Sequence, residues 1–94
     1  MKYGIVSSKR YRKDYKRIVR SGFDMEKLER VIDELAAGKT LADRHHDHAL
    51  KEDLQGTREC HIAPDWLLRY GKNKDQLVLL LISTGDHRRV LGIE

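Results

Sequence analysis

The sequence predicts an α+β domain in which two N-terminal helices pack on one face of a small antiparallel sheet. The order is β-α-α-β-β-β, or the same with one more strand at the end. Two stretches within the first 37 residues carry apolar side chains at helical spacing, and residues 58–83 contain short apolar runs separated by turn signals. The 94 residues are enough for one modest core, so we expect a single domain over 1–94.

Residues 2–7 form the first predicted strand, and a helix follows it directly. Ser7 or Ser8 can cap that helix by accepting a hydrogen bond from a free backbone N–H. The helix runs to about Arg20 and ends at Gly22, because glycine tolerates the left-handed cap conformation. Its predicted buried stripe is Tyr11, Tyr15, Ile18 and Val19.

The second predicted helix begins after Asp24, a good cap residue, and runs to about Ala37 before Gly38 stops it. Its predicted buried stripe is Leu28, Val31, Ile32 and Leu35. Residues 39–57 are polar and follow neither helical nor strand periodicity, so we expect a long loop. A loop of this length in a small domain is usually functional or mobile.

The last part of the chain is predicted to form the sheet. Pro64 separates the first two strands because it cannot donate to a ladder. Turns are expected at 71–75 and 84–86, and the apolar run between them indicates a central strand buried on both faces. The expected strands are 58–62, 66–70, 76–83 and a short edge strand at 89–93.

Charge is distributed unevenly along the chain, whose net charge is +4. Residues 1–22 hold eight Lys or Arg against one Asp, a net of +7, whereas residues 24–36 hold five acidic and two basic side chains, a net of −3. The positive segment suits a phosphate backbone or an acidic partner. A solvated basic helix face is an equally good interpretation.

Composition also points to a compartment. The single cysteine, Cys60, excludes an intrachain disulfide and fits a reducing environment. The longest apolar run, 77–82, is far shorter than the roughly 20 residues that span a bilayer, and the N-terminus lacks the apolar core of a signal peptide. We therefore expect a soluble, cytoplasmic protein without membrane contact.

The richest chemistry lies in residues 58–70, with His48 before them and His87 after them. This stretch gathers imidazole, carboxylate, guanidinium and indole groups. Clustered histidines on a basic chain, without a nucleophile or metal signature, favour acid–base chemistry on a polyanion. This pattern points towards cleavage of RNA, with no cofactor.

Four segments carry a resemblance to a known family: 48–50 (HAL), 56–61 (GTRECH), 64–70 (PDWLLRY) and 84–87 (TGDH). Together with the order of elements, they resemble the YafQ branch of the RelE toxins. The resemblance implies a RelE-like fold and the toxin half of a bacterial toxin–antitoxin pair. It also implies cleavage of messenger RNA, typically on the ribosome.

The resemblance assigns roles to individual residues. Positions matching functional residues of the family are His48, His61, Asp65, Trp66 and His87. His46 is the alternative to His48 if the loop register differs, and His87 matches the family's proton donor. Arg58 joins the expected substrate-binding residues.

Two positions depart from the family pattern. Relatives usually carry an arginine just before Thr-Gly, where this chain has Ser83, and an aromatic residue where it has Leu91. The first difference affects stabilisation of transition-state charge, and the second affects base stacking. Arg88 and Arg89 lie close in sequence and are candidates to replace the missing charge.

RNA can be cleaved without a metal by its own 2′-hydroxyl, which needs a base at that hydroxyl and an acid at the leaving 5′-oxygen. Histidine suits both tasks because its unperturbed pKa is about 6.5. A carboxylate such as Asp65 can raise the pKa of a nearby imidazole. His87 would be the acid, and the base would be His61, His48 or Asp65.

Simpler interpretations apply to several of these residues. Trp66 heads a strand and is more often a core residue than a substrate platform, and Cys60 is expected to be a small buried residue. The run His45-His46-Asp47-His48 offers metal ligands. Neighbouring loop residues seldom all point inward, so we expect no native metal site.

The leading hypothesis is a ribosome-dependent messenger RNA endonuclease. Its expected partners are messenger RNA, the ribosome and a cognate antitoxin, with operator DNA bound only through the antitoxin. The main alternative is a non-enzymatic inhibitor resembling the ParE-like proteins, which share the fold and block DNA gyrase. A weakened toxin that acts as an antitoxin-binding repressor component is a third hypothesis.

Overall fold

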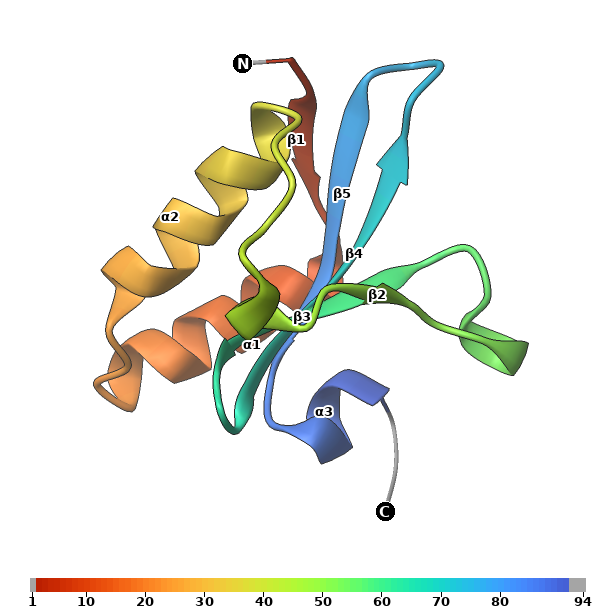
Figure 1. Cartoon of the computed structure of the whole chain (residues 1–94). Coiled ribbons are helices and arrows are strands. Elements are labelled where there is room, and N and C mark those ends of the chain that lie inside the picture. Colours follow the sequence, from red (N-terminus) through yellow and green to blue (C-terminus); the bar gives the residue numbers. More distant parts are fainter. Residues whose placement is uncertain (1, 92–94) are drawn as a thin grey trace.

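A computed structural model describes residues 2–91 and confirms the α+β class (Figure 1). Two helices lie on one side of a sheet, and a short third helix lies near its other side. The elements in chain order are β1 (Gly4–Ser7), α1 (Lys9–Arg20), α2 (Met25–Ala36), η1 (Asp43–His45), β2 (His48–Ala49), η2 (Glu52–Leu54), β3 (Arg58–Ala63), β4 (Trp66–Asn73), β5 (Val78–Gly85) and α3 (His87–Leu91).

The sheet has the order β1-β5-β4-β3-β2, and one of its pairings differs from the prediction. β2, β3, β4 and β5 pair antiparallel, but β1 pairs parallel with β5, so the sheet is mixed. A parallel pair needs a long connection rather than a hairpin, and the intervening helices and strands supply it. The direction of β1 relative to β5 depends on the path of the chain between them, and the spacing of apolar residues within a strand does not encode that path.

Both predicted caps are present. The hydroxyl of Ser8 accepts a hydrogen bond from the backbone N–H of Tyr11, and its Oγ also donates to the carbonyl of Ile82, so it fastens the start of α1 to β5. The side chain of Asp24 accepts from the backbone N–H of Glu26 at the start of α2. These contacts fix where each helix begins relative to the sheet.

The core lies between the two long helices and the sheet. Strand alternation directs every second residue of β3 and β4 towards the helices, so Cys60 and Ile62 are buried there, whereas His61 faces the opposite side. The predicted stripe of α2 is buried throughout. Of the stripe predicted for α1, Tyr11 and Ile18 are buried, but Val19 is 48% exposed.

The prediction of a last strand at 89–93 is wrong within the described residues, since His87–Leu91 form α3. The carboxylate of Asp86 accepts from the backbone N–H of Arg89, and its carbonyl accepts from that of Val90, which favours a helical turn. Val90 is fully buried and so is Leu67 on β4, which faces away from the main core. Residues 92 and 93 lie outside the described part.

Residues 39–57 are more ordered than the predicted loop, because they contain η1, β2 and η2. β4 also continues to Asn73, which moves the expected turn at 71–75 towards residues 74–77. Within residues 2–91, no helix is long and apolar enough to cross a membrane.

Candidate active site

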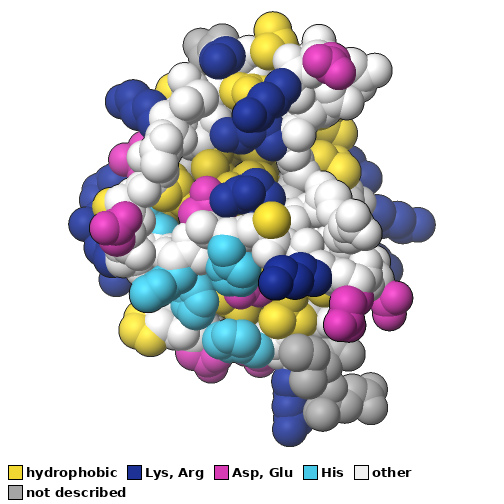
Figure 2. All heavy atoms as spheres, turned by 45° about the vertical axis from the view of Figure 1, so that its right-hand side comes forward, with side chains coloured by type: hydrophobic (Ala, Val, Ile, Leu, Met, Phe, Trp, Pro, Cys, Tyr) yellow, Lys and Arg dark blue, Asp and Glu magenta, His cyan; other side chains and the backbone are white. Residues whose placement is uncertain are grey.

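Three histidine rings lie in a row on the face of the sheet opposite the two long helices. The centroids of the His46 and His61 rings are 5.5 Å apart, and those of His61 and His87 are 5.7 Å apart. Figure 2 shows histidine side chains gathered in one patch with Lys or Arg side chains beside it. The fold thus brings together imidazoles from the loop before β2, from β3 and from α3.

His87 is oriented by a carboxylate. Its Nδ1 lies 3.3 Å from Oδ1 of Asp65, which follows β3, and the two side chains are 48% and 81% exposed. Because a carboxylate accepts, Nδ1 carries the proton in this contact, and Nε2 is the nitrogen that can exchange a proton with a substrate. The predicted pairing of a carboxylate with an imidazole is therefore present.

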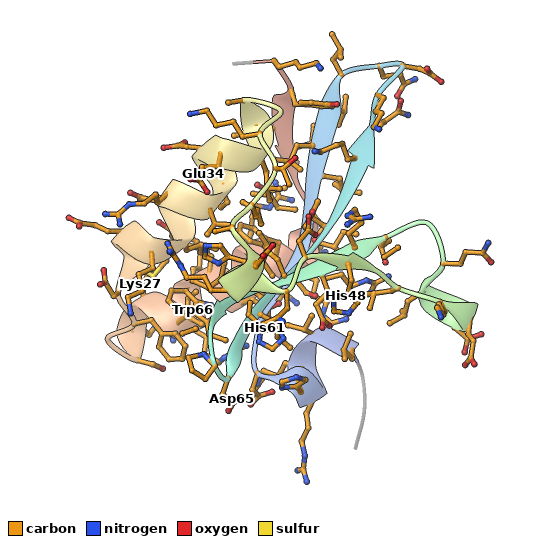
Figure 3. The ribbon with its side chains drawn as sticks, in the orientation of Figure 1. Lys27, Glu34, His48, His61, Asp65 and Trp66 are labelled. Carbon is orange, nitrogen blue, oxygen red and sulfur yellow. The ribbon has the colours of Figure 1, made fainter. Side chains whose placement is uncertain are left out.

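His48 lies farther along the same sheet edge than the three-ring row. It pairs with Glu59 across β2 and β3, and its Nε2 is 3.4 Å from Oε1 of that residue. Its Nδ1 is 2.6 Å from the carbonyl oxygen of His46, so Nδ1 carries a proton and Nε2 faces the carboxylate. Figure 3 shows His48 and His61 on neighbouring strands and Asp65 beyond them.

His46, the alternative to His48, is the loop residue whose ring meets His61. It adopts a left-handed backbone with φ of 47°. Such a conformation costs a non-glycine residue on the order of 1 kcal/mol, and it marks sites where the surrounding structure imposes the geometry.

Glu59 is a residue of this site that the sequence analysis missed. It is only 4% exposed, and its Oε2 has no hydrogen-bond partner within residues 2–91. Its position in the sequence could have revealed it. Residues two apart on a strand share a face, and Glu59 precedes His61 by two. A buried carboxylate beside His48 is an orienting group for that imidazole.

Trp66 is a core residue, in agreement with the simpler interpretation and against a stacking role. It is 5% exposed, its ring meets Phe23 edge-on at 4.9 Å, and its Nε1 donates to the hydroxyl of Thr84 over 2.9 Å. Burial leaves no ring face for a base. Its contribution to the site is structural, because its hydrogen bond to Thr84 joins the start of β4 to the end of β5.

Asp14 on α1 was also missed. It is an acidic residue at a buried helix position, 6% exposed, and its Oδ2 accepts from the backbone N–H of Thr84. Arg17 pairs with its Oδ1 at 3.0 Å and reaches the carbonyl of Thr84 at 3.4 Å. The sequence did offer a signal for Asp14, because an acidic residue on the apolar stripe of a basic helix indicates a buried, bonded carboxylate.

Asp47 holds the loop before β2 in place. Its Oδ1 accepts from the hydroxyl of Tyr70 at 2.6 Å and from Nε of Arg58 at 3.3 Å. Burial raises the pKa of Tyr70, and the bond to Asp47 raises it further. Burial lowers the pKa of Arg58, but hydrogen bonds to Tyr70 and Asp47 outweigh it and raise the pKa overall. Arg58 is thus engaged within the protein, and strand alternation puts its side chain on the face of Cys60 and Ile62, opposite that of His61.

The predicted substrate-binding residues near the C-terminus lie on α3. Arg88 and Arg89 are exposed, and Leu91 is half-buried. Ser83, which stands where relatives carry arginine, is fully buried on β5, directly opposite Arg69 of β4. The side chain of Arg69 turns towards Thr57, whose hydroxyl oxygen accepts from its Nε at 3.2 Å.

The side chains of residues 45–48 are directed to different partners. His45 is buried with Nδ1 bonded to the carbonyl of His61 at 2.7 Å, and His46 meets the ring of His61. Asp47 and His48 bind the groups described above. Among residues 2–91, no three His, Cys, Asp or Glu side chains are grouped as metal ligands.

Comparison with known proteins gives consistent matches. The family model described as a bacterial toxin of type II toxin–antitoxin system, YafQ, matches residues 3–92. An mRNA interferase toxin YafQ from Escherichia coli K12 is 35% identical over 89 residues, which cover 94% of this chain and 95% of that protein.

Solved structures agree with the family match. The metal-bound toxin from Helicobacter pylori has a TM-score of 0.88 at 40% identity, covering 94% of this chain and 98% of that one. YafQ in its E. coli complex with DinJ has a TM-score of 0.86 at 30% identity, covering 96% and 99%. The fold, the match over residues 3–92 and these relatives together show that the chain belongs to the YafQ family of type II toxin–antitoxin toxins.

Proposed function

We propose that this protein is a toxin that cleaves messenger RNA on the ribosome, by acid–base catalysis that uses the RNA 2′-hydroxyl and no metal. The observation that carries this proposal is the pair of rings at His61 and His87, 5.7 Å apart, with Asp65 bonded to the second. Two imidazoles at this separation can address the two ends of one phosphodiester reaction. The relative from E. coli K12 is named an mRNA interferase, which supports the same activity here.

In the proposed reaction a base removes the 2′-hydroxyl proton, and the oxygen attacks the adjacent phosphorus. The bond to the 5′-oxygen breaks, and His87 donates the proton that this oxygen takes up. The products are a 2′,3′-cyclic phosphate and a 5′-hydroxyl end. Of the candidate bases His48, His61 and Asp65, we favour His61, because its ring is next to that of His87 while Asp65 already orients His87.

The proposed catalytic residues are therefore His48, His61, Asp65 and His87, and the side chains proposed to bind substrate are Arg58, Arg88, Arg89 and Leu91. His48 and Glu59 form a second ionisable pair at the edge of this site. The site takes residues from β2, β3, α3 and the segment after β3, and we propose that 1–94 form one functional domain.

Partners follow from the same proposal. The solved DinJ–YafQ complex supports an antitoxin partner for this chain, and operator DNA would be bound only through that antitoxin. A basic chain would approach ribosomal RNA largely through charge. Action on translating ribosomes places the protein in the cytoplasm.

The test is to induce the chain in growing bacteria and to map new 5′-hydroxyl ends of messenger RNA, beside the His87→Ala variant. We expect growth arrest with new ends for the wild-type chain and neither for the variant. A defined messenger RNA with and without purified ribosomes then tests ribosome dependence. Toxin that has been treated with EDTA and desalted before it is added to the ribosomes tests metal independence. Growth arrest with intact messenger RNA would instead support the non-enzymatic inhibitor hypothesis.

A further inference from the structure

A pocket of about 620 Å³ opens beside the three-ring row, between α2 and the end of β3. η1 and the residue after it form another of its walls. His46 and His61 line this pocket, and their rings also belong to the three-ring row of the proposed active site, so the pocket and that site adjoin each other. Its volume falls in the range of about 300–1,000 Å³ that is typical of small-molecule sites.

The rim of the pocket is cationic. Lys27 and Arg30 project from α2 and Arg44 from η1, against one carboxylate, that of Glu34. Figure 3 shows Lys27 and Glu34 on α2, with His61 on the sheet beside that helix. An excess of positive charge around an open pocket favours an anionic ligand.

The floor of the pocket is apolar. Val31 and Ile62 are 3% and 7% exposed, and Ala63 and Pro64 complete the wall on the β3 side. His46 and His61 also line the pocket. Apolar and aromatic walls with a cationic rim match the two halves of a nucleotide, because a base stacks on the former and a phosphate pairs with the latter.

We propose that this pocket binds the nucleotide next to the scissile phosphodiester, with its base over Ala63 and Pro64 and its phosphate between Lys27 and Arg30. This inference rests on the proposed function and extends it, since it assigns a substrate-positioning role to α2. RNA is favoured over an acidic protein segment because the pocket shares His46 and His61 with the site where the phosphodiester would react.

The first measurement is an NMR titration of the full chain, read on methyl and histidine ring signals, with 2′-O-methyl oligoribonucleotides of six residues, one for each base. The 2′-O-methyl group removes the attacking hydroxyl, so the RNA binds but is not cleaved. We expect the methyl signals of Val31, Ile62 and Ala63 to shift and to saturate together with the ring signals of His61. Val78, on the distant β4–β5 hairpin, serves as the reference that stays in place.

The second measurement uses substitutions of opposite sign in the same pocket. Lys27→Ala combined with Arg30→Ala should weaken binding about tenfold and lower the slope of log K against log salt by about 0.7 for each lost phosphate contact. Glu34→Gln should tighten binding about threefold, since it removes a repulsive charge. Alanine suits an exposed helix position, so these variants keep the fold. Lys74→Ala, on the hairpin, removes one positive charge far from the pocket and is the control for a change of net charge.

The two proposals fail separately. If His61 and His87 shift while the pocket methyls stay in place, or if the charge variants bind as the wild type does, the inference is wrong and the nuclease proposal stands. If the pocket methyls shift but no messenger RNA is cleaved, the nuclease proposal fails and the binding site stands. If an antitoxin moves these methyls and RNA does not, the pocket is a protein-docking surface and the inference is wrong.

Discussion

The indole nitrogen of Trp66 donates a buried hydrogen bond of 2.9 Å to the hydroxyl of Thr84, which in turn donates to the carbonyl of Leu67. Trp66 directly follows Asp65, and Thr84 precedes His87 by three residues. The bond therefore ties together the two segments that carry the ion-paired side chains of the proposed site. A residue that never reaches the substrate can still set the distance between two that do.

We predict that Trp66→Phe lowers both stability and cleavage. It removes the donor to Thr84, which should cost about 1–2 kcal/mol in the free energy of unfolding and about tenfold in single-turnover cleavage. Urea unfolding and rate measurements test the two effects. Phe23→Leu is the matched control, because it removes the edge contact with the indole but keeps the hydrogen bond. Normal cleavage by Trp66→Phe would show that the bond does not position the site.

We predict that His87→Ala abolishes toxicity and slows cleavage by about 10²–10⁴-fold, the usual contribution of a general acid. The side chain is half-exposed and outside the core, so the thermal unfolding midpoint and antitoxin binding should stay unchanged. Lys74→Ala, on the distant hairpin, is the control for effects of expression and purification. An equally toxic His87→Ala chain would remove the assignment of His87 as proton donor.

Arg88 and Arg89 are predicted to supply positive charge to the reacting phosphate. They would replace the arginine that relatives carry at the position of Ser83. Arg88→Ala combined with Arg89→Ala should slow cleavage about tenfold or more, because stabilisation of developing charge is often a large catalytic contribution. Single-turnover rates at saturating substrate separate this effect from weaker binding. Unchanged rates would exclude the replacement.

The pair of His48 and Glu59 is predicted to act as a unit. Glu59→Gln and His48→Gln should each lower cleavage by about tenfold, and the double variant should be no worse than either, because each single change already breaks the same contact. The second readout is the pH dependence of the cleavage rate. Glu59→Gln should change it if Glu59 orients His48, and should leave it unchanged if Glu59 is only structural. Additive losses would mean that the two side chains act separately.

Cys60 is predicted to be chemically inert in the folded chain. Burial, with further contributions from Asp47 and Glu59, raises its pKa to about 12. The thiol therefore stays protonated at pH 8, so iodoacetamide should label it only after unfolding. Since the folded state holds the proton more tightly than the unfolded state, this group lowers stability as the pH rises above about 8.5, the ordinary thiol value. Rapid labelling of native protein would contradict the burial.

Much of the fold was predictable because its signals are local. The caps at Ser8 and Asp24 are each readable within about one helical turn, and the apolar stripe of α2 within about two. The segment 89–93 was predicted as a strand, because a short run with an apolar valine and leucine fits either structure. Two tertiary features favour the helix α3. The carboxylate of Asp86 accepts from the backbone N–H of Arg89, and Val90 is buried against the far face of the sheet.

The sequence by itself determined the α+β class, the helix starts and the side chains that carry the proposed chemistry, since these depend on composition, spacing and short motifs. Only the tertiary structure decided that His46 rather than His48 meets His61, that Glu59 lies beside His48 on the neighbouring strand, and that Trp66 is an internal support. These relationships depend on strand register and chain direction. A shift of one residue between β2 and β3 would exchange the neighbours of every side chain on that edge.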